Sequence, residues 1–227
     1  ALSTDAQRPP RPSMPNIQID IKSLDMDARG VGHLENEDGS SGKVIFVEGA
    51  LPGERVSFLT FKRKKNWEAA RMTELHKPSS MRVEPPCPHF DICGGCSMQH
   101  LEPSAQVAMK QRVLEDNLWH ISKVKSENIM RPMHGPTWGY RFRARLSVRH
   151  VAKKNTVLVG FHEKRSAFVA DISTCLILPP HVAAMLLPLL GLIGSLSLFD
   201  QIPQIEVAIG EGLTVLVLRI MAPLTKA

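Results

Sequence analysis

The four cysteines of this 227-residue chain are the residues whose spacing points most directly to chemistry. Cys87, Cys93 and Cys96 lie close together, with Gly94 and Gly95 between the last two, whereas the fourth cysteine is far along the chain. Thiolates are the ligands of iron–sulfur clusters, and three local cysteines plus a distant fourth are a common arrangement. Glycines in such a loop let the backbone approach a cluster and aim N–H groups at its sulfurs. The pattern predicts one [4Fe-4S] cluster held by Cys87, Cys93, Cys96 and Cys175.

Three other interpretations of these thiols stay open. Zinc sites usually combine two Cys-x2-Cys pairs, a pattern that the five residues between Cys87 and Cys93 do not follow. A zinc variant would join three thiolates to an imidazole from His89 or His100. Two disulfides would suit a small secreted domain better than a chain of this length, and a set of buried, inert thiols is the third possibility.

Composition describes the rest of the chain in general terms. Hydrophobic residues make up 43% and charged residues 22%, which is typical of a soluble globular protein. The length suggests two domains. A formal net charge of +6 is compatible with a polyanionic partner such as a nucleic acid, without requiring one.

One apolar stretch, residues 175–199, carries no formal charge and is long enough to cross a bilayer. Pro179, Pro180 and Pro188 divide it into pieces that are too short to span a membrane alone. The sequence therefore predicts short buried helices here.

The N-terminal part predicts a flexible tail followed by a small β-barrel. Residues 1–16 contain four prolines and almost nothing apolar to bury. From Ile17 the chain alternates between apolar and polar residues, with Gly- and Pro-containing turns between short segments, one such turn being expected at Gly30–Gly32. This spacing indicates a barrel over residues 17–78.

The segment from Asp25 to Gly32, followed by Phe-Val-x-Gly-x-Leu-Pro-Gly-Glu at residues 46–54, is similar to the TRAM domain, an OB-like barrel of RNA-modifying enzymes. A basic turn lies beside it, formed by Lys62, Arg63, Lys64 and Lys65 and followed by Trp67. Such a turn is often only a solvated loop. The resemblance favours contact with an RNA backbone, with Trp67 either stacking on a base or packing internally.

Residues 79–227 predict a second, α+β domain. A cluster loop is followed by an amphipathic helix over residues 102–121. Packing against a core would explain the apolar side of this helix. A strand over residues 140–149 would project four arginines from one face, as either a solvated edge or a ladder for phosphates: Arg141, Arg143, Arg145 and Arg149. Further strands are expected at 157–161 and 168–172.

The order of these motifs resembles the N-terminal half of bacterial 23S ribosomal RNA (uracil-5-)-methyltransferases that carry a TRAM domain and a [4Fe-4S] cluster. Four motifs carry the resemblance beyond the barrel: Cys87-x5-Cys93-Gly-Gly-Cys96-x3-His100, Gly139-Tyr-Arg-x-Arg-Ala-Arg-Leu-Ser147, Gly160-Phe161 and Asp171-x3-Cys175-x-Ile-Leu178. The resemblance implies that the four cysteines bind the cluster and that Arg141, Arg143 and Arg145 lie in or near the RNA cleft. It also implies a monomeric cytoplasmic protein that acts on 23S ribosomal RNA.

The chain departs from this family at the catalytic step. Family members use S-adenosylmethionine, and a further cysteine adds to C6 of uracil. All four cysteines of this chain are assigned to the cluster, so none remains as nucleophile. The only Gly-x-Gly after a strand, Gly210-Glu211-Gly212, is followed by another β-branched run, which predicts a hairpin and no cofactor loop.

We therefore expect a β-rich α+β protein with three segments: a tail at 1–16, an OB-like TRAM barrel at 17–78, and an incomplete cluster-bearing central domain at 79–227. The expected function is the RNA-recognition and iron–sulfur half of a methyltransferase, inactive alone, with S-adenosylmethionine bound only by the full-length parent. Two alternatives are a stand-alone RNA-binding iron–sulfur protein and a TRAM-containing radical S-adenosylmethionine methylthiotransferase. A fourth cluster ligand at Cys175 argues against the latter, because that class leaves one iron open.

Overall fold

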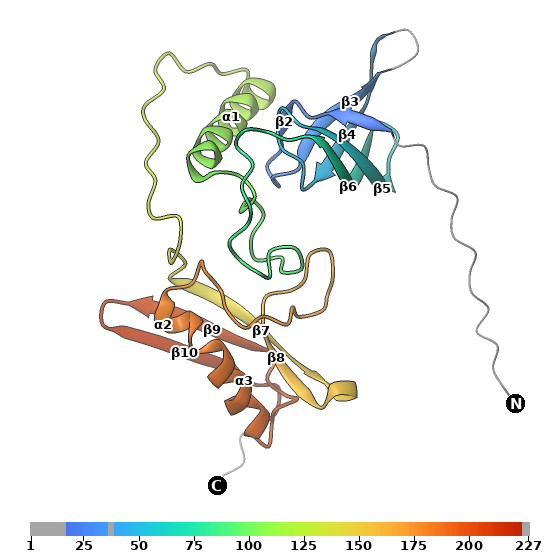
Figure 1. Ribbon diagram of the computed structural model, residues 1–227. Coiled ribbons are helices and arrows are strands. Elements are labelled where there is room, and N and C mark those ends of the chain that lie inside the picture. Colours follow the sequence, from blue (N-terminus) through green and yellow to red (C-terminus); the bar gives the residue numbers. More distant parts are fainter. Residues whose placement is uncertain (1–16, 36–38, 224–227) are drawn as a thin grey trace, which may run out of the picture. The chain divides into compact units, whose positions relative to one another are not determined.

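The computed structural model describes residues 17–35 and 39–223, so the tail expected at 1–16 lies outside the described residues. The chain divides into two compact units, with the boundary after Arg82. We call the part before this boundary unit 1 and the part after it unit 2. Each unit is built on one β-sheet, and helices are found in unit 2 (Figure 1).

Unit 1 is a six-stranded sheet formed by β1 (Gln18–Asp20), β2 (Ser23–Leu24), β3 (Gly30–Glu35), β4 (Ser41–Glu48), β5 (Arg55–Arg63) and β6 (Trp67–Lys77). The strand order is β1-β5-β6-β4-β3-β2, and only the β4–β6 pair is parallel. The two edge strands are separated by only Ile21 and Lys22. One bent segment therefore supplies both edge strands, pairing with β5 at one edge and with β3 at the other, so the sheet curls round. Its core includes Ile45, Val47 and Val56.

The prediction of a turn at Gly30–Gly32 is wrong, because both glycines belong to strand β3. The chain turns just before them, where the Asp25 carboxylate accepts the backbone N–H of Arg29 and Ala28 adopts a positive φ of 61°. A Cβ at Gly32 would lie 2.7 Å from Ile19 Cδ1. The glycines thus allow β3 to lie directly against the apolar side chains of the first strand.

A buried ion pair ties the end of unit 1 to its sheet. Glu54 is fully buried, and its carboxylate accepts bonds from Arg82 Nε at 2.6 Å and Nη2 at 2.8 Å. The backbone N–H groups of Leu51 and Ser79 donate to the same carboxylate. Burial opposes the charge, but the Arg82 and backbone hydrogen bonds outweigh it and lower the pKa of Glu54. The segment that leads to the unit boundary is therefore anchored by one carboxylate.

Replacing Glu54 with Gln should destabilise unit 1 by about 3 kcal/mol, because it leaves a partly buried guanidinium without its counter-charge. Since the folded-state pKa is lowered, this contribution is present above the ordinary glutamate pKa and is lost as the pH falls through the folded-state value. Amide hydrogen exchange in β4 to β6 measures both effects. Asp20→Asn, which breaks the exposed Asp20–Arg55 pair, is the matched control and should change exchange little. Equal effects of the two variants would contradict the anchoring role.

Unit 2 contains a four-stranded antiparallel sheet of order β10-β9-β7-β8. Its elements are α1 (Pro103–Ser122), β7 (Arg143–Val151), the 3-10 turn η1 (Ala152–Lys154), β8 (Thr156–Gly160), α2 (Pro180–Ala183), α3 (Leu186–Ser195), β9 (Gln204–Gly210) and β10 (Leu213–Arg219). The hairpin predicted at Gly210–Gly212 is confirmed as the β9–β10 turn, with Gly212 at φ +70°.

One face of this sheet is covered by the short helices α2 and α3 (Figure 1). The core between them includes Leu146, Val159, Leu186 and Ile193. Pro188 lies in the first turn of α3, where a missing backbone N–H costs no helical bond. The short buried helices predicted for the apolar stretch are confirmed, and among the described residues no helix is long and apolar enough to cross a membrane.

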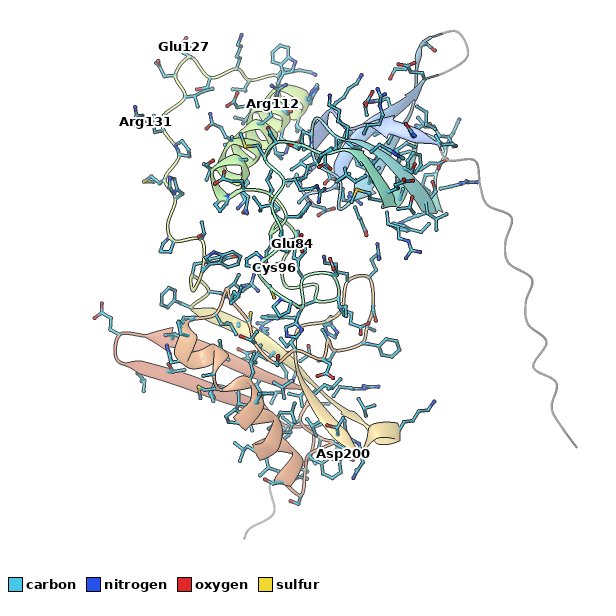
Figure 2. The ribbon with its side chains drawn as sticks, in the orientation of Figure 1. Glu84, Cys96, Arg112, Glu127, Arg131 and Asp200 are labelled. Carbon is cyan, nitrogen blue, oxygen red and sulfur yellow. The ribbon has the colours of Figure 1, made fainter. Side chains whose placement is uncertain are left out.

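The helix predicted over residues 102–121 is confirmed as α1, which the Glu102 carboxylate caps by accepting two backbone N–H bonds. Its apolar side does not lie in a core, because Leu114, Leu118 and Ile121 are exposed. An exposed stretch without regular structure follows, on which Glu127 and Arg131 lie (Figure 2). The strand expected at 168–172 is also wrong: only an isolated bridge joins Val169 to His162.

Candidate functional site

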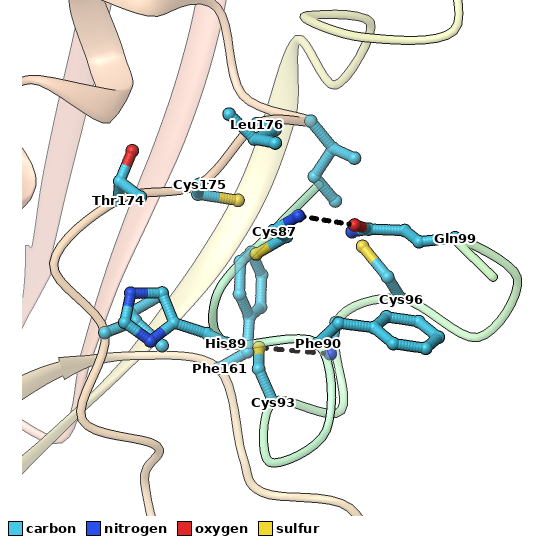
Figure 3. A pocket seen from close by; sticks show the side chains of 13 residues that line it. Cys87, His89, Phe90, Cys93, Cys96, Gln99, Phe161, Thr174, Cys175 and Leu176 are labelled. Carbon is cyan, nitrogen blue, oxygen red and sulfur yellow. Dashed lines mark hydrogen bonds between the residues drawn. The ribbon is translucent and has the colours of Figure 1, made fainter. Parts of the chain in front are cut away.

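All four cysteines line a single pocket of unit 2. Cys87, Cys93 and Cys96 come from the loop before α1, and Cys175 comes from the segment between β8 and α2. Figure 3 shows the four side chains turned toward the same space. The remaining lining residues are His89, Phe90, Gly95, Gln99, Phe161, Ile172, Thr174, Leu176 and Ile177. The fold thus brings the three cysteines of the loop and the distant Cys175 to the same pocket.

The two glycines of the cysteine loop have different roles. Gly95 donates its N–H to Cys93 Sγ at 3.4 Å, as expected of a loop that directs backbone dipoles at sulfur. Gly94 donates its N–H to the carbonyl of His162 at 2.8 Å, and a Cβ at Gly94 would lie 2.9 Å from that oxygen. The glycines therefore allow the loop to pair closely with the segment that follows β8.

The two histidines considered as imidazole ligands are placed differently. His89 lines the pocket, but its Nε2 accepts the backbone N–H of Ser173 at 3.2 Å and so ties the cysteine loop to the segment before Cys175. His100 is buried at a tilted angle beside Phe90 and is not among the lining residues. Neither arrangement favours an imidazole as the fourth ligand.

The pocket disfavours free thiolates. Burial raises the pKa of Cys93, with the neighbouring cysteines adding to the effect, while the Gly95 N–H and Lys164 oppose it. Burial also raises the pKa of Cys175, against the backbone N–H groups of Leu178 and Ile177. A cation or cluster that binds here must displace thiol protons, so binding would release protons and weaken at low pH.

The spacing of the donors bears on the kind of metal site. Within residues 17–35 and 39–223, no three Cys, His, Asp or Glu side chains are close enough together to bind one metal ion. Zinc–sulfur bonds of about 2.3 Å would require sulfurs about 4 Å apart. In this structure the four thiols line one pocket but are not gathered at the spacing of a single-ion site.

The arginines of β7 occupy the face of the sheet opposite α2 and α3. Ala144, Leu146 and Val148 are buried, so the alternation of the strand turns Arg143, Arg145, Ser147 and Arg149 outward. Arg145 also lies 3.5 Å from Glu206 on the neighbouring strand. The shared face predicted for Arg143, Arg145 and Arg149 is confirmed.

Arg141 does not belong to this ladder, because β7 begins at Arg143. Its backbone N–H donates to Ile177 and its guanidinium lies 5.4 Å from the centre of the Phe161 ring, beside the cysteine pocket. The sequence missed Arg219, which the register places in one row with Gln204 and Ser147 on the outward face. The hairpin turn signals the register of β9 with β10, but nothing in the sequence signals the pairing of β9 with β7.

The turn predicted at residues 62–65 begins later than expected, because Lys62 and Arg63 are the last residues of β5 and only Lys64 and Lys65 lie in the turn to β6. All four cationic side chains are exposed. Lys62 lies over the Trp67 ring at 5.4 Å, and Arg63 lies 3.6 Å from Glu68. Trp67 also meets Phe46 edge to face, with ring centres 5.9 Å apart. Trp67 is therefore half-buried in an aromatic and cationic cluster on the outside of the sheet.

Comparison with known proteins gives a consistent result. The chain is 64% identical over 92% of its length to the 23S rRNA (uracil(1939)-C(5))-methyltransferase RlmD of Cupriavidus necator and 60% identical over 92% to that of Burkholderia pseudomallei. It covers 47% and 45% of those proteins, so the chain spans about half the length of the relatives it matches. No protein-family model matches the chain.

Among solved structures, the chain is similar to the Pyrococcus abyssi tRNA (uracil-54, C5)-methyltransferase in complex with S-adenosyl-L-homocysteine. The TM-score is 0.57 at 19% identity, over 90% of this chain and 46% of that one. This likeness concerns the fold. The chain therefore matches a fragment of the 23S rRNA (uracil(1939)-C(5))-methyltransferase family, namely the N-terminal region of its relatives.

Proposed function

We propose that the chain is the RNA-recognition and iron–sulfur part of an S-adenosylmethionine-dependent 23S rRNA (uracil-5-)-methyltransferase, which forms 5-methyluridine at position 1939 in the full-length protein. The observation that carries the proposal is the pocket lined by all four cysteines, in a chain whose relatives are named for that activity. S-adenosylmethionine would be bound by the remainder of the full-length protein.

The proposed ligands of a [4Fe-4S] cluster are Cys87, Cys93, Cys96 and Cys175. Two features support the assignment: the donors surround one pocket, and a backbone N–H is directed at Cys93. When bound, such a cluster would join the cysteine loop to the segment before α2. Four ligands would also leave no iron open, which is unlike the radical S-adenosylmethionine enzymes.

The proposed RNA contacts lie on both units. In unit 1 we propose that the curled sheet is a TRAM-type, OB-like barrel whose basic turn contacts phosphates, with residues Lys62, Arg63, Lys64, Lys65 and Trp67. In unit 2 the exposed Arg143 and Arg145 would do the same, with Arg141 nearby. Guanidinium and ammonium groups that meet phosphates supply affinity and position without reading the base sequence.

This proposal predicts a strongly salt-dependent interaction with RNA. Changing Lys62, Arg63, Lys64 and Lys65 together to Gln should reduce the slope of log affinity against log salt by about 3, because about 0.7 to 0.9 counterions are released for each phosphate contact. The measurement is fluorescence anisotropy with a labelled 23S rRNA fragment at several salt concentrations.

The matched control removes four exposed cations elsewhere, at Lys123, Lys125, Arg131 and Lys153. This control should leave the slope nearly unchanged. Salt-independent binding by the unaltered chain, or equal losses in both variants, would count against the proposed RNA surface.

A further inference from the structure

A cation lies over each of the two phenylalanine rings that line the cysteine pocket. The Lys164 ammonium is 3.9 Å from the centre of the Phe90 ring, and the Arg141 guanidinium is 5.4 Å from the centre of the Phe161 ring. The two cations come from different segments of unit 2, one after β8 and one before β7. Each cation therefore lies against an aromatic ring that forms part of the pocket lining, although neither cation lines the pocket itself.

Backbone contacts fix Lys164 relative to the cysteines. Its N–H donates to the carbonyl of Ile92 at 2.8 Å, next to Cys93 in the sequence. An isolated β-bridge pairs Cys93 with the preceding residue, Glu163. Lys164 is therefore held beside the cysteine loop by the same pairing that positions that loop.

The surroundings of Lys164 supply little compensation for its charge. The side chain is only partly exposed, and among the described residues no carboxylate lies within 4.0 Å of its ammonium. Asp91 is the neighbouring acidic residue, at longer range. A partly desolvated cation is costly unless an anion or an aromatic face compensates it. A negatively charged occupant of the pocket would provide that compensation.

We propose that Lys164, assisted by Arg141, sets the charge balance of the iron–sulfur cluster and favours its reduced form. The inference rests on the proposed function, since it takes the four cysteines as cluster ligands. Reduction adds one electron, and hence one negative charge, to the cluster, and a cation nearby stabilises the more negative state. Net charge and solvent exposure are among the properties that set cluster potentials. Lys164 is thus a tuning residue and not a ligand.

The test is a dithionite titration of the reconstituted, anaerobic chain, in which dithionite supplies the electron and electron paramagnetic resonance measures the reduced cluster. We expect Lys164→Gln to shift the reduction equilibrium about tenfold toward the oxidised cluster, which corresponds to a potential about 59 mV lower for one electron. Lys164→Arg keeps the charge and should stay close to the unaltered chain. Lys153→Gln, at the far end of the β7–β8 hairpin, removes the same charge and should not shift the equilibrium.

Two further measurements keep the outcome decisive. Arg141→Gln should shift the reduction equilibrium in the same direction as Lys164→Gln. This variant replaces Lys164→Gln as the test if the lysine variant does not bind a cluster. The rate at which ferricyanide oxidises and destroys the cluster should rise in both variants. This rate replaces the reduction equilibrium as the readout if dithionite does not reduce the cluster.

Unchanged equilibria and loss rates in Lys164→Gln and Arg141→Gln, or an equal shift in Lys153→Gln, would overturn the inference. Equal behaviour of Lys164→Gln and Lys164→Arg would assign Lys164 a purely structural role and would overturn it as well. An unaltered chain that binds no iron would instead overturn the proposed function, so the two failures are distinguishable.

Discussion

Replacing Cys175 with Ser is expected to reduce the iron content of the reconstituted chain from about four atoms to nearly none and to loosen unit 2, while unit 1 stays folded. Cys175 is only 8% exposed and belongs to the core of unit 2. It is also the one proposed ligand outside the cysteine loop, so it would couple cluster binding to the packing of that unit. Iron and sulfide analysis measures the first effect. Hydrogen exchange in β7 to β9, compared with β4 to β6, measures the second.

The control for this experiment is Val159→Ala, which opens the same core without touching a proposed ligand. It should cost roughly 1 kcal/mol or more of stability and still allow the chain to bind the cluster. A Cys175→Ser chain with undiminished iron would contradict the assignment. Iron loss of equal size in Val159→Ala would show that core packing, and not ligation, controls the iron content.

The 227-residue chain is expected to transfer no methyl group to 23S ribosomal RNA, although its relatives are named methyltransferases. Methylation at C5 of uracil requires a thiolate that adds to C6. The chain has four cysteines, and all four line one pocket. Recruiting any one of them as nucleophile would remove a proposed cluster ligand.

Labelled S-adenosylmethionine and a 23S ribosomal RNA fragment provide the assay for this prediction. The chain alone should leave the RNA unlabelled, and one of its full-length relatives should label one uridine. Labelling by the chain, purified free of host methyltransferases, would contradict the prediction and would require a different role for at least one cysteine.

The four-cysteine pocket was the part of the molecule most accessible to sequence reasoning. Cysteines at 87, 93 and 96 lie near one another in any fold, and a solitary fourth thiol indicates a long-range partner. What sequence could not provide is the set of contacts that long-range pairing creates. Lys164 reaches the Phe90 ring only because the segment after β8 pairs with the cysteine loop, and Arg219 joins the arginine face only through the pairing of β9 with β7.

Residue type was misleading where one amino acid serves two purposes. Gly30 and Gly32 suggested a turn, because glycine permits unusual backbone angles. In the fold they lie in a strand, where the absence of a side chain permits close contact with Ile19 and Ile21. Similarly, the apolar run at 168–172 has strand composition, but it makes a single bridge at Val169 and continues toward Cys175 without a ladder partner.

Iron, acid-labile sulfide and zinc analysis of the anaerobically prepared chain is the most direct test of the central claim, that four cysteines hold one iron–sulfur cluster. We expect a brown protein with about four irons and four sulfides per chain and no stoichiometric zinc. One zinc ion per chain without labile sulfide would contradict it.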